Sequence, residues 1–168
     1  AQAVICNSGN ANTCNANGIE VAQQMAALTA DALNINNEDV VVASTGVIGL
    51  PLDIIPIKEG IPELVSGLSD DKRVEAAEGI MTTDTKKKEI AVSMTLGGKE
   101  VTLGGMCKGS GMIHPNMCTM LGFITTDANI SKELLDKALK EDVQDTYNMV
   151  SVDGDTSTND TVLLMANG

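Results

Sequence analysis

Hydrophobic residues form two kinds of pattern in the first half of the chain. Short, mostly apolar runs at residues 1–6 (AQAVIC) and 40–44 (VVVAS) predict two buried strands. Residues 7–18 (NSGNANTCNANG) are dominated by Asn and Gly and predict a loop with tight backbone turns. From Ile19 onward, helically spaced apolar positions predict a helix: Val21, Ala22, Met25, Leu28, Ala32 and Leu33.

Proline interrupts the pattern in the middle of the chain. Pro51, Pro56 and Pro62 predict that this segment forms only short helical turns. The stretch that follows them, DDKRVEAAEGIM, predicts a helix that starts near Asp70.

Strand and helix patterns alternate in the second half. Residues 89–106 predict a hairpin, because two alternating runs flank a Gly-Gly-Lys turn. Residues 119–127 (TMLGFITTD) predict an apolar strand, and residues 131–148 predict a helix with a Ser N-cap. The final segment, residues 159–168 (NDTVLLMANG), predicts a capped helix. Together these elements predict a layered α+β domain.

Composition narrows the range of partners. The 168 residues fit one domain, and with one Phe, one Tyr and no Trp the core must be aliphatic. Such a chain has no aromatic surface on which nucleic-acid bases could stack. A net charge of -12 repels both phosphate backbones and anionic membranes, so we expect neither nucleic acid nor a membrane as a partner.

The cysteines and the chain ends bear on the compartment. Four cysteines without a signal-like opening favour a reducing compartment, so a cytoplasmic protein is expected. No apolar run approaches the roughly 18 residues that a membrane span requires. The opening AQAVIC lacks an initiator Met and the chain stops at LLMANG, which is typical of an excised or processed piece.

The stretch from Cys107 to Leu121, CKGSGMIHPNMCTML, concentrates the candidate chemistry. The possible ligands of a zinc site are the four cysteines and the single histidine: Cys6, Cys14, Cys107, Cys118 and His114. Their spacing does not match that of a zinc knuckle, so the cysteines are better interpreted as buried or incidental thiols. A Cys118–His114 nucleophile pair lacks a third group to orient the base, so a structural loop histidine is favoured.

Two other loop motifs fail on spacing. GGMCKGSG does not match a phosphate-binding loop, because Lys108 precedes a glycine instead of following one. Residues 153–160 (DGDTSTND) resemble a calcium loop, yet Thr158 stands at the glycine position and Leu164 at the bidentate Glu position. An acidic turn is the better interpretation of that segment.

Thr119 has two interpretations. As a residue of high β-propensity it fits a plain strand position, and physics of the single sequence favours that interpretation. Alternatively, its hydroxyl attacks the carbonyl of Cys118, and the chain is cut to leave Thr119 as a new N-terminus. The freed α-amine would then act as the base for its own hydroxyl.

Four motifs follow one another along the chain: STGVIG (44–49), IMTTDT (80–85), KGSGMIHPNMCTML (108–121) and VDGDTSTNDTVLL (152–164). In sequence and in order they resemble the ornithine acetyltransferase family of bifunctional glutamate N-acetyltransferases in arginine biosynthesis. NSGNAN near the start extends the resemblance over essentially the whole chain.

The resemblance implies a fold and a division of the chain. The fold would be a layered α/β/β/α-like sandwich of the N-terminal-nucleophile kind, incomplete at both ends. Residues 1–168 would be the central catalytic portion of a longer enzyme. Residues 1–118 would end the α chain, and residues 119–168 would begin the β chain after self-cleavage between Cys118 and Thr119. The family usually has Ala where Cys118 stands.

The resemblance also implies the roles of individual residues. Thr119 would be the nucleophile that is acetylated in a ping-pong cycle. Thr45 and Gly46 would stabilise the oxyanion, and Thr82 and Lys108 would bind substrate together with Thr119. Acetyl would move from N-acetylornithine, or from acetyl-CoA as an alternative donor, to glutamate. No metal and no further cofactor are implied, and the expected assembly is a heterotetramer of two α and two β chains.

Two alternatives share parts of this pattern. An N-terminal-nucleophile hydrolase or aminopeptidase would cleave itself in the same way but pass the acyl group to water. A non-catalytic fragment would fold without turnover, since family enzymes carry further residues on both sides of this region.

Overall fold

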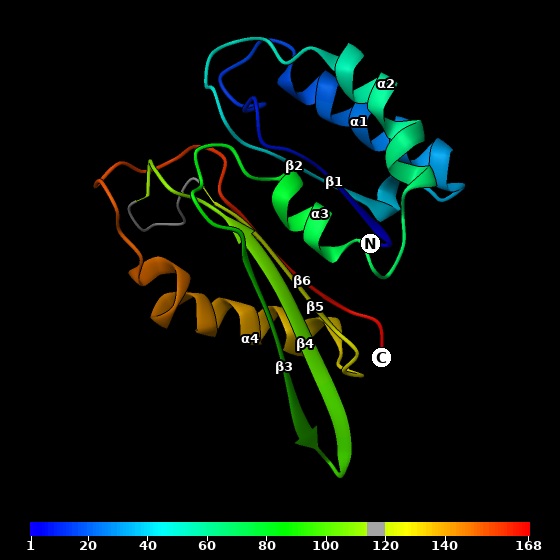
Figure 1. Ribbon diagram of the computed structural model, residues 1–168, viewed down its shortest axis with the longest axis vertical. Coiled ribbons are helices and arrows are strands. Elements are labelled where there is room, and N and C mark those ends of the chain that lie inside the picture. The colour runs from blue at the N-terminus through cyan, green and yellow to red at the C-terminus, as the bar shows by residue number, and fades with distance from the viewer. Residues whose placement is uncertain (114–119) are drawn as a thin grey trace. The chain divides into compact units, whose positions relative to one another are not determined.

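The computed structural model describes residues 1–113 and 120–168 (Figure 1). His114, Cys118 and Thr119 lie outside the described residues. The chain separates into two compact units, Ala1–Thr82 and Thr83–Gly168. Each unit is built around its own sheet. The length of the chain, which fits one domain, could not predict this division.

The first unit is a parallel β-α-β arrangement. Strand β1 (Ala3–Asn7) pairs in parallel with β2 (Val40–Ser44), and helix α1 (Gly18–Leu33) connects them, followed by a short 3₁₀ turn, η1 (Asn37–Asp39). The strands predicted at 1–6 and 40–44 and the helix predicted from Ile19 are confirmed. Asn34, with φ of 56°, ends α1 in the left-handed conformation that asparagine tolerates.

The core of this unit is aliphatic, as the composition predicts. Met25 on α1 is completely buried, and Ile5 on β1 and Val40 on β2 pack in the same cluster. Leu52 and Ile61 close it from the segment that follows β2. Because the cluster joins both strands to both neighbouring helices, it fixes where the chain emerges after β2.

Helix α2 (Ile54–Ser66) corrects the expectation of short turns. Asp53 caps it by accepting a hydrogen bond from the Ile55 N–H at 2.9 Å. Pro56 falls in the first turn, where its missing N–H has no intrahelical partner to lose. Pro62 lies inside the helix and is exposed, whereas Ile61, about a quarter turn away, lies on the face that packs into the core. Burial of that face outweighs the interruption.

Helix α3 (Arg73–Gly79) begins three residues after the predicted start at Asp70, because residues 70–72 form a turn. Within the described ranges, no helix is long and apolar enough to cross a membrane.

The second unit is a four-stranded sheet in the order β3-β4-β5-β6. The predicted hairpin is confirmed as β3 (Lys88–Leu96) and β4 (Lys99–Lys108), joined through Gly97 and Gly98 with positive φ. Strand β5 (Leu121–Thr126) is antiparallel to β4 and parallel to β6 (Thr161–Ala166). The tip of the hairpin extends beyond the other strands (Figure 1).

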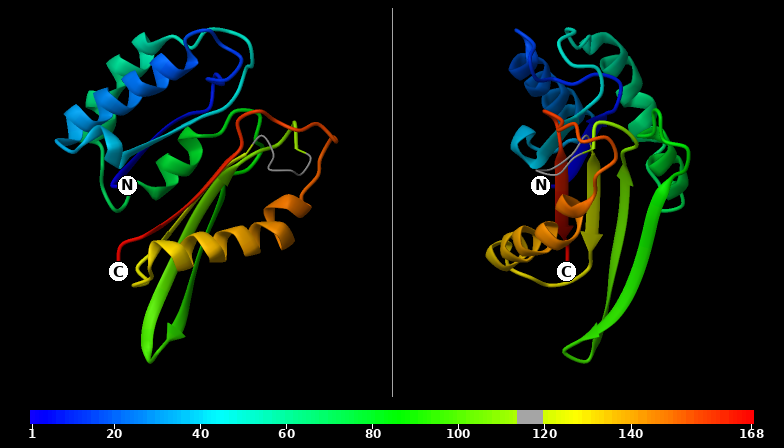
Figure 2. Two further views of the ribbon diagram at one scale, coloured as in Figure 1. Left: turned by 180° about the vertical axis from the view of Figure 1, so that it is seen from behind. Right: turned by 90° about the vertical axis from the view of Figure 1, so that its left-hand side faces the viewer.

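Helix α4 (Lys132–Asp145) and a 3₁₀ turn, η2 (Tyr147–Met149), connect β5 to β6. Ser131 caps α4 as predicted, by accepting a hydrogen bond from Leu134 N–H at 3.4 Å. The least exposed residues of α4 recur every four positions, and the helix lies alongside the sheet (Figure 2).

The final helix predicted at residues 159–168 is wrong, because this segment forms strand β6. Its apolar run, Val162–Ala166, is only five residues long, and such a run has no periodicity that separates strand from helix. Pairing with β5 decides the outcome, with Leu121 opposite Thr161 and Thr126 opposite Ala166. The mixed α+β class is confirmed, with four α-helices and two sheets in the described residues.

Candidate active site

A sharp loop follows β2 at the carboxyl end of the two-stranded sheet. Asn7 and Ser44 end their strands opposite each other, and the Thr45 N–H donates to the Asn7 carbonyl at 2.9 Å. This bond continues the pairing by one residue and fixes the backbone at Thr45. The next residue, Gly46, then turns the chain away from the sheet.

The Thr45 side chain is fully buried, and its Oγ1 has no hydrogen-bond partner among the described residues. A buried hydroxyl without a partner costs about 1–3 kcal/mol, so a fold keeps one only where something compensates for it. A buried polar atom without a partner therefore needs an explanation, and a catalytic role is one of the recognised explanations. Thr45 Oγ1 is therefore a buried donor with which no described residue pairs.

Gly46 cannot be another residue in this conformation. Its φ is 128°, and a Cβ at this position would lie 2.4 Å from the Gly9 carbonyl oxygen and 2.8 Å from the Asn10 nitrogen. Its N–H forms no hydrogen bond within the described residues. Adjacent unpaired donors at Thr45 and Gly46 are chemically suited to stabilising a developing negative charge.

The Asn-rich loop supports this turn. Asn7 Oδ1 accepts from the N–H groups of Gly9 and Asn10 at 2.9 and 3.3 Å, and Asn7 Nδ2 donates to the Asn10 carbonyl at 2.7 Å. Gly9 in turn accepts from the Val47 N–H at 3.2 Å. Sequence reasoning predicted a tight loop here but gave Asn7 no part in the site; its signal was the density of Asn beside a buried strand.

Asn10 extends the same support toward α2. Its Nδ2 donates to the carbonyls of Leu50 and Pro51 at 3.0 and 3.4 Å. Asn10 also forms an isolated parallel β-bridge with Val47. The loops before α1 and after β2 are therefore one hydrogen-bonded structure.

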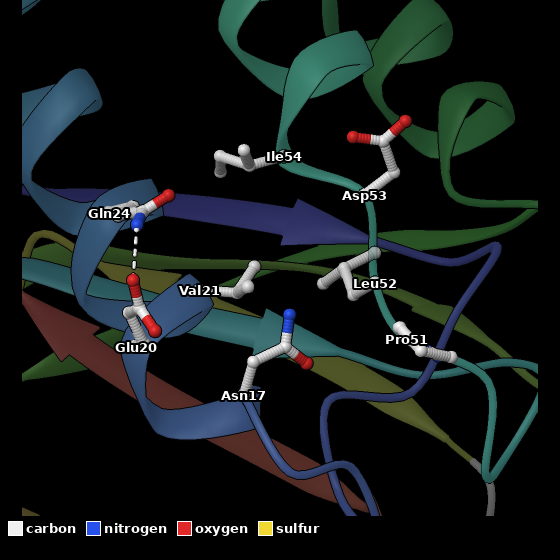
Figure 3. Close-up of a pocket in the computed structure, with 8 residues that line it drawn as sticks. All are labelled: Asn17, Glu20, Val21, Gln24, Pro51, Leu52, Asp53 and Ile54. Atoms are coloured by element: carbon white, nitrogen blue, oxygen red, sulfur yellow. Dashed lines mark hydrogen bonds between the residues drawn. The ribbon is translucent and has the colours of Figure 1, made fainter.

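An open pocket of about 360 Å³ lies in the first unit between the first turns of α1 and the segment leading into α2. Figure 3 shows Glu20 and Gln24 hydrogen-bonded to each other on one side of it and Asp53 on the other. Neither Thr45 nor Gly46 lines this pocket. It holds none of the predicted site residues, and its shallow form gives no reason to place chemistry there.

The second group of site residues surrounds Lys108, at the end of β4. The residue is only 4% exposed, and its cross-strand partner Leu121 is completely buried. Burial lowers the pKa of Lys108, and the negative charge of Asp84 opposes that change. In such a buried place the charge of the ammonium is screened less by bulk water, so a nearby negative charge acts on it more strongly.

Asp84 is a site residue that sequence reasoning missed. Its side chain is inaccessible to solvent, and Oδ1 accepts both Lys88 Nζ at 2.6 Å and the Gly109 N–H at 2.8 Å. Next to it, the hydroxyls of Thr83 and Ser110 lie 2.5 Å apart and share a hydrogen bond. The available signal was an acidic residue in the MTTDT stretch, where only Thr82 had been singled out. Thr82 itself is exposed at the end of the first unit.

Two aspartates hold the described residues on either side of 114–119. Asp153 accepts from the N–H groups of Met112 and Ile113 at 2.6 and 2.8 Å, and these backbone bonds lower its pKa. Asp160 Oδ1 accepts from the Met120 N–H at 2.9 Å. The segment 153–160, interpreted from sequence as an acidic turn, therefore provides both anchors.

Asp160 is the more perturbed of the two acids. Burial raises its pKa to about 6, against the lowering effect of the hydrogen bond from Met120. Its Oδ2 is buried and has no hydrogen-bond partner among the described residues. This carboxyl, whose pKa is raised to about 6, is hydrogen-bonded to Met120, the residue at which the described chain resumes.

A metal site finds no support in the described part of the chain. No group of three or more His, Cys, Asp or Glu residues is arranged to hold an ion there. Cys6, Cys14 and Cys107 are free thiols, and burial raises the pKa of Cys6 and of Cys107. The proposed cleavage pair, Cys118 and Thr119, lies outside the described residues.

The structure thus places Thr45 and Gly46 together in the first unit and Lys108 with Asp84 in the second. A comparison with protein families matches residues 1–168, the whole chain, to the ArgJ family. The chain belongs to the ArgJ family. This is the family of bifunctional ornithine acetyltransferases and glutamate N-acetyltransferases, so the resemblance seen in the four motifs is confirmed.

Similar proteins agree with this assignment. The ArgJ protein of Caldanaerobacter subterraneus subsp. tengcongensis, an "arginine biosynthesis bifunctional protein", is 54% identical over 169 residues, covering 100% of this chain and 42% of that protein. The glutamate N-acetyltransferase of Methanocaldococcus jannaschii is 51% identical over 170 residues, covering 99% and 42%. This chain therefore spans 42% of the length of these two relatives.

A solved structure is also similar. The crystal structure of the arginine biosynthesis bifunctional protein ArgJ from Bacillus halodurans superposes with a TM-score of 0.59 at 40% identity. The match covers 70% of this chain and 61% of that one. The fold of this chain is accordingly the ArgJ fold over the matched part.

Proposed function

We propose that the gene product containing this chain is an acetyltransferase of arginine biosynthesis that transfers acetyl from N-acetylornithine, or from acetyl-CoA, to glutamate. The observation that carries the proposal is the pair of unpaired donors at Thr45 and Gly46. Acyl transfer is the chemistry that needs such a pair, because its tetrahedral intermediate places a negative charge on the former carbonyl oxygen. Membership of the ArgJ family supports the choice of substrates.

Thr119 is the nucleophile in this proposal. Its hydroxyl first attacks the Cys118 carbonyl, and water hydrolyses the resulting ester, which leaves Thr119 with a free α-amine. That amine then takes the proton from Oγ as Oγ attacks the acetyl carbonyl of N-acetylornithine. Thr45 Oγ1 and the Gly46 N–H donate to the oxyanion. Support comes from Asp153 and Asp160, which hold the backbone on either side of this segment.

The reaction consists of two half-reactions, acetylation of Thr119 and transfer of the acetyl group to glutamate. The tetrahedral adduct collapses, the carbon–nitrogen bond breaks, and ornithine leaves with the proton that the amine had taken. Acetyl then remains as an ester on Thr119. The α-amine of glutamate attacks this ester, Thr119 Oγ leaves and is reprotonated, and N-acetylglutamate is released. No redox step or metal ion takes part in the sequence.

Lys108 binds the α-carboxylate that donor and acceptor share, and Thr82 contributes a hydroxyl. An acidic protein with a net charge of -12 repels such substrates in general, so a buried cation gives them a local site. Residues outside this chain would complete the pocket and the layered α/β/β/α-like sandwich. We further propose a cytoplasmic heterotetramer of two α and two β chains.

Residues 1–168 alone should not turn over. The chain spans 42% of its relatives, and β3 exposes an apolar row on one face, with Ile90 at 70% and Leu96 at 52% exposed. A sheet face of this composition is expected to be covered in the complete protein.

Mass spectrometry of the denatured intact gene product tests self-cleavage. Pieces that end at Cys118 and start at Thr119 are expected, and an uncut chain would contradict the cleavage step. A Thr119→Ala protein should neither cleave nor transfer acetyl. If it still transfers acetyl, Thr119 is not the nucleophile.

Acetylornithine incubated with and without glutamate separates the transferase from a hydrolase. The transferase should release ornithine chiefly when glutamate is present, whereas a hydrolase or aminopeptidase releases it equally in both samples. Calorimetry adds a check on the isolated chain. If the intact gene product binds acetylornithine and residues 1–168 alone do not, this chain holds only part of the binding site.

A further inference from the structure

Asp84 is buried far more deeply than its ion-pair partner. Its side chain has no solvent-accessible surface, whereas Lys88 is 42% exposed. Carboxylates are almost never fully buried unless they are paired and hydrogen-bonded. Here one oxygen receives both the Lys88 ammonium and the Gly109 N–H. An ion pair on the exposed surface would not need a backbone donor in addition to the Lys88 ammonium. The hydrogen bond from Gly109 therefore indicates that Asp84 has a role in holding the loop that follows Lys108.

The surroundings of Lys108 make this charge important. Of the charged groups near Lys108, Asp84 is the anion and Lys88 is a second cation. Cys107 precedes it on β4, and burial raises the pKa of that thiol, which keeps it uncharged. Across the sheet Lys108 faces the apolar Leu121. The negative charge of Asp84 therefore acts against the effect of burial on the Lys108 ammonium.

We propose that Asp84 is a positioning residue for the Lys108 carboxylate site: it fixes the loop at Gly109 and supplies the negative charge that keeps Lys108 an ammonium ion. The inference rests on the proposed function, in which Lys108 binds the substrate carboxylate. Asp84 itself touches no reacting atom.

The sign of the pH effect follows from the charges. Burial lowers the pKa of Lys108, Asp84 raises it and Lys88 lowers it. Only the protonated form attracts a carboxylate, so binding is complete below this pKa and is lost as the pH rises through it. Removing Asp84's charge should move that loss to lower pH, and removing Lys88's charge should move it to higher pH.

Asp84→Asn in the intact gene product separates charge from geometry, because Asn Oδ1 can still accept from Gly109. We expect the alkaline fall of kcat/KM for N-acetylornithine to occur at lower pH, with KM raised about tenfold at pH 9, less at pH 7, and kcat little changed. Asp136→Asn is the matched control: Asp136 pairs with Lys140 at the same 2.6 Å, but on the exposed surface of α4. It should leave the profile unchanged.

Lys88→Met is the second variant, and it keeps the test decisive if Asp84→Asn does not fold. It should move the alkaline fall to higher pH, opposite to Asp84→Asn. A folded Asp84→Asn or Lys88→Met protein with the wild-type pH profile would overturn the proposal. Wild-type protein without any acetyl transfer would instead refute the proposed function, so the two failures are distinguishable.

Discussion

Asp160 and Met120 are joined by a hydrogen bond of 2.9 Å between the carboxylate and the backbone N–H, across 40 residues of chain. The next residue, Thr161, donates its N–H to the Met120 carbonyl, also at 2.9 Å. Both backbone polar groups of Met120 are therefore held by the start of β6. One function of the motif VDGDTSTNDTVLL is thus to hold Met120, the residue that follows Thr119, through Asp160 and Thr161.

Asp160→Asn should raise stability at pH 8 and leave it nearly unchanged at pH 4. The folded-state pKa of Asp160, about 6, lies above the ordinary 3.8, so the folded protein binds the extra proton between these values. Stability is consequently highest below pH 4 for this group and declines as pH rises through 6. Because the group is partly exposed, we expect a gain of only about 2–4 °C in Tm.

Thermal unfolding of wild type and variant at both pH values checks this expectation. Asp145→Asn, at the exposed end of α4, is the control and should behave like wild type. An equal Tm difference at pH 4 and pH 8 would show that the effect of Asp160→Asn does not come from its charge.

Thr45→Val should separate activity from stability. Valine has nearly the shape of threonine and removes a buried hydroxyl that has no partner in the described chain, so stability should stay equal or increase. Under the proposed function acetyl transfer should fall about 10²- to 10³-fold, because the substitution removes one of the two proposed oxyanion donors. Urea unfolding together with kcat measurements checks both parts.

Thr29→Val is the matched control for Thr45→Val. Thr29 is also buried in the first unit, but its hydroxyl donates to the Met25 carbonyl at 2.8 Å. The control should lose about 1 kcal/mol of stability and keep its activity. A Thr45→Val enzyme of wild-type activity would remove Thr45 from the oxyanion site.

The elements that could be predicted from sequence are those with a strong local signal. Helix α1 has long helical periodicity, and the β3–β4 hairpin has alternation around two glycines, so both were located correctly. Strand β6 was not, because its five apolar residues suit either structure until β5 is present to pair with them. Helix α2 was underestimated for a related reason: the energy that overrides its prolines comes from the tertiary core around Ile61.

The site shows the same limit. The resemblance of the motifs to the family pointed to Thr45, Gly46 and Lys108, and their roles stay predictions. Asp84 and Asn7 went unassigned, since their importance comes from hydrogen bonds to Gly109 and to the loop at Gly9, which only the folded backbone brings within reach. Thr119 stays a prediction from the motif.

Gly46→Ala should destabilise the first unit more than Gly49→Ala does. Both glycines have positive φ, which costs a residue with a Cβ about 1–2 kcal/mol. Only at Gly46 would that Cβ also meet backbone, 2.4 Å from the Gly9 carbonyl oxygen, whereas Gly49 has open space around it. Urea denaturation of both variants isolates this steric contribution, and equal losses would show that Gly9 can move aside.

Asn7→Ala should destabilise the loop at Gly9 and Asn10, which supports the turn at Gly46, without removing the donor groups of Thr45 and Gly46. The substitution removes three hydrogen bonds that hold Gly9 and Asn10, and an Asn7→Asp protein keeps the two that the side-chain oxygen accepts. We expect a loss of about 1–3 kcal/mol in the free energy of unfolding for Ala and a smaller loss for Asp.

Activity should follow the same order, because Gly9 accepts the Val47 N–H and so places the turn at Gly46. Measuring kcat alongside urea unfolding tests the connection. If Asn7→Ala is destabilised but fully active under folding conditions, the loop geometry at Gly46 does not depend on Asn7, and β2 alone must set it.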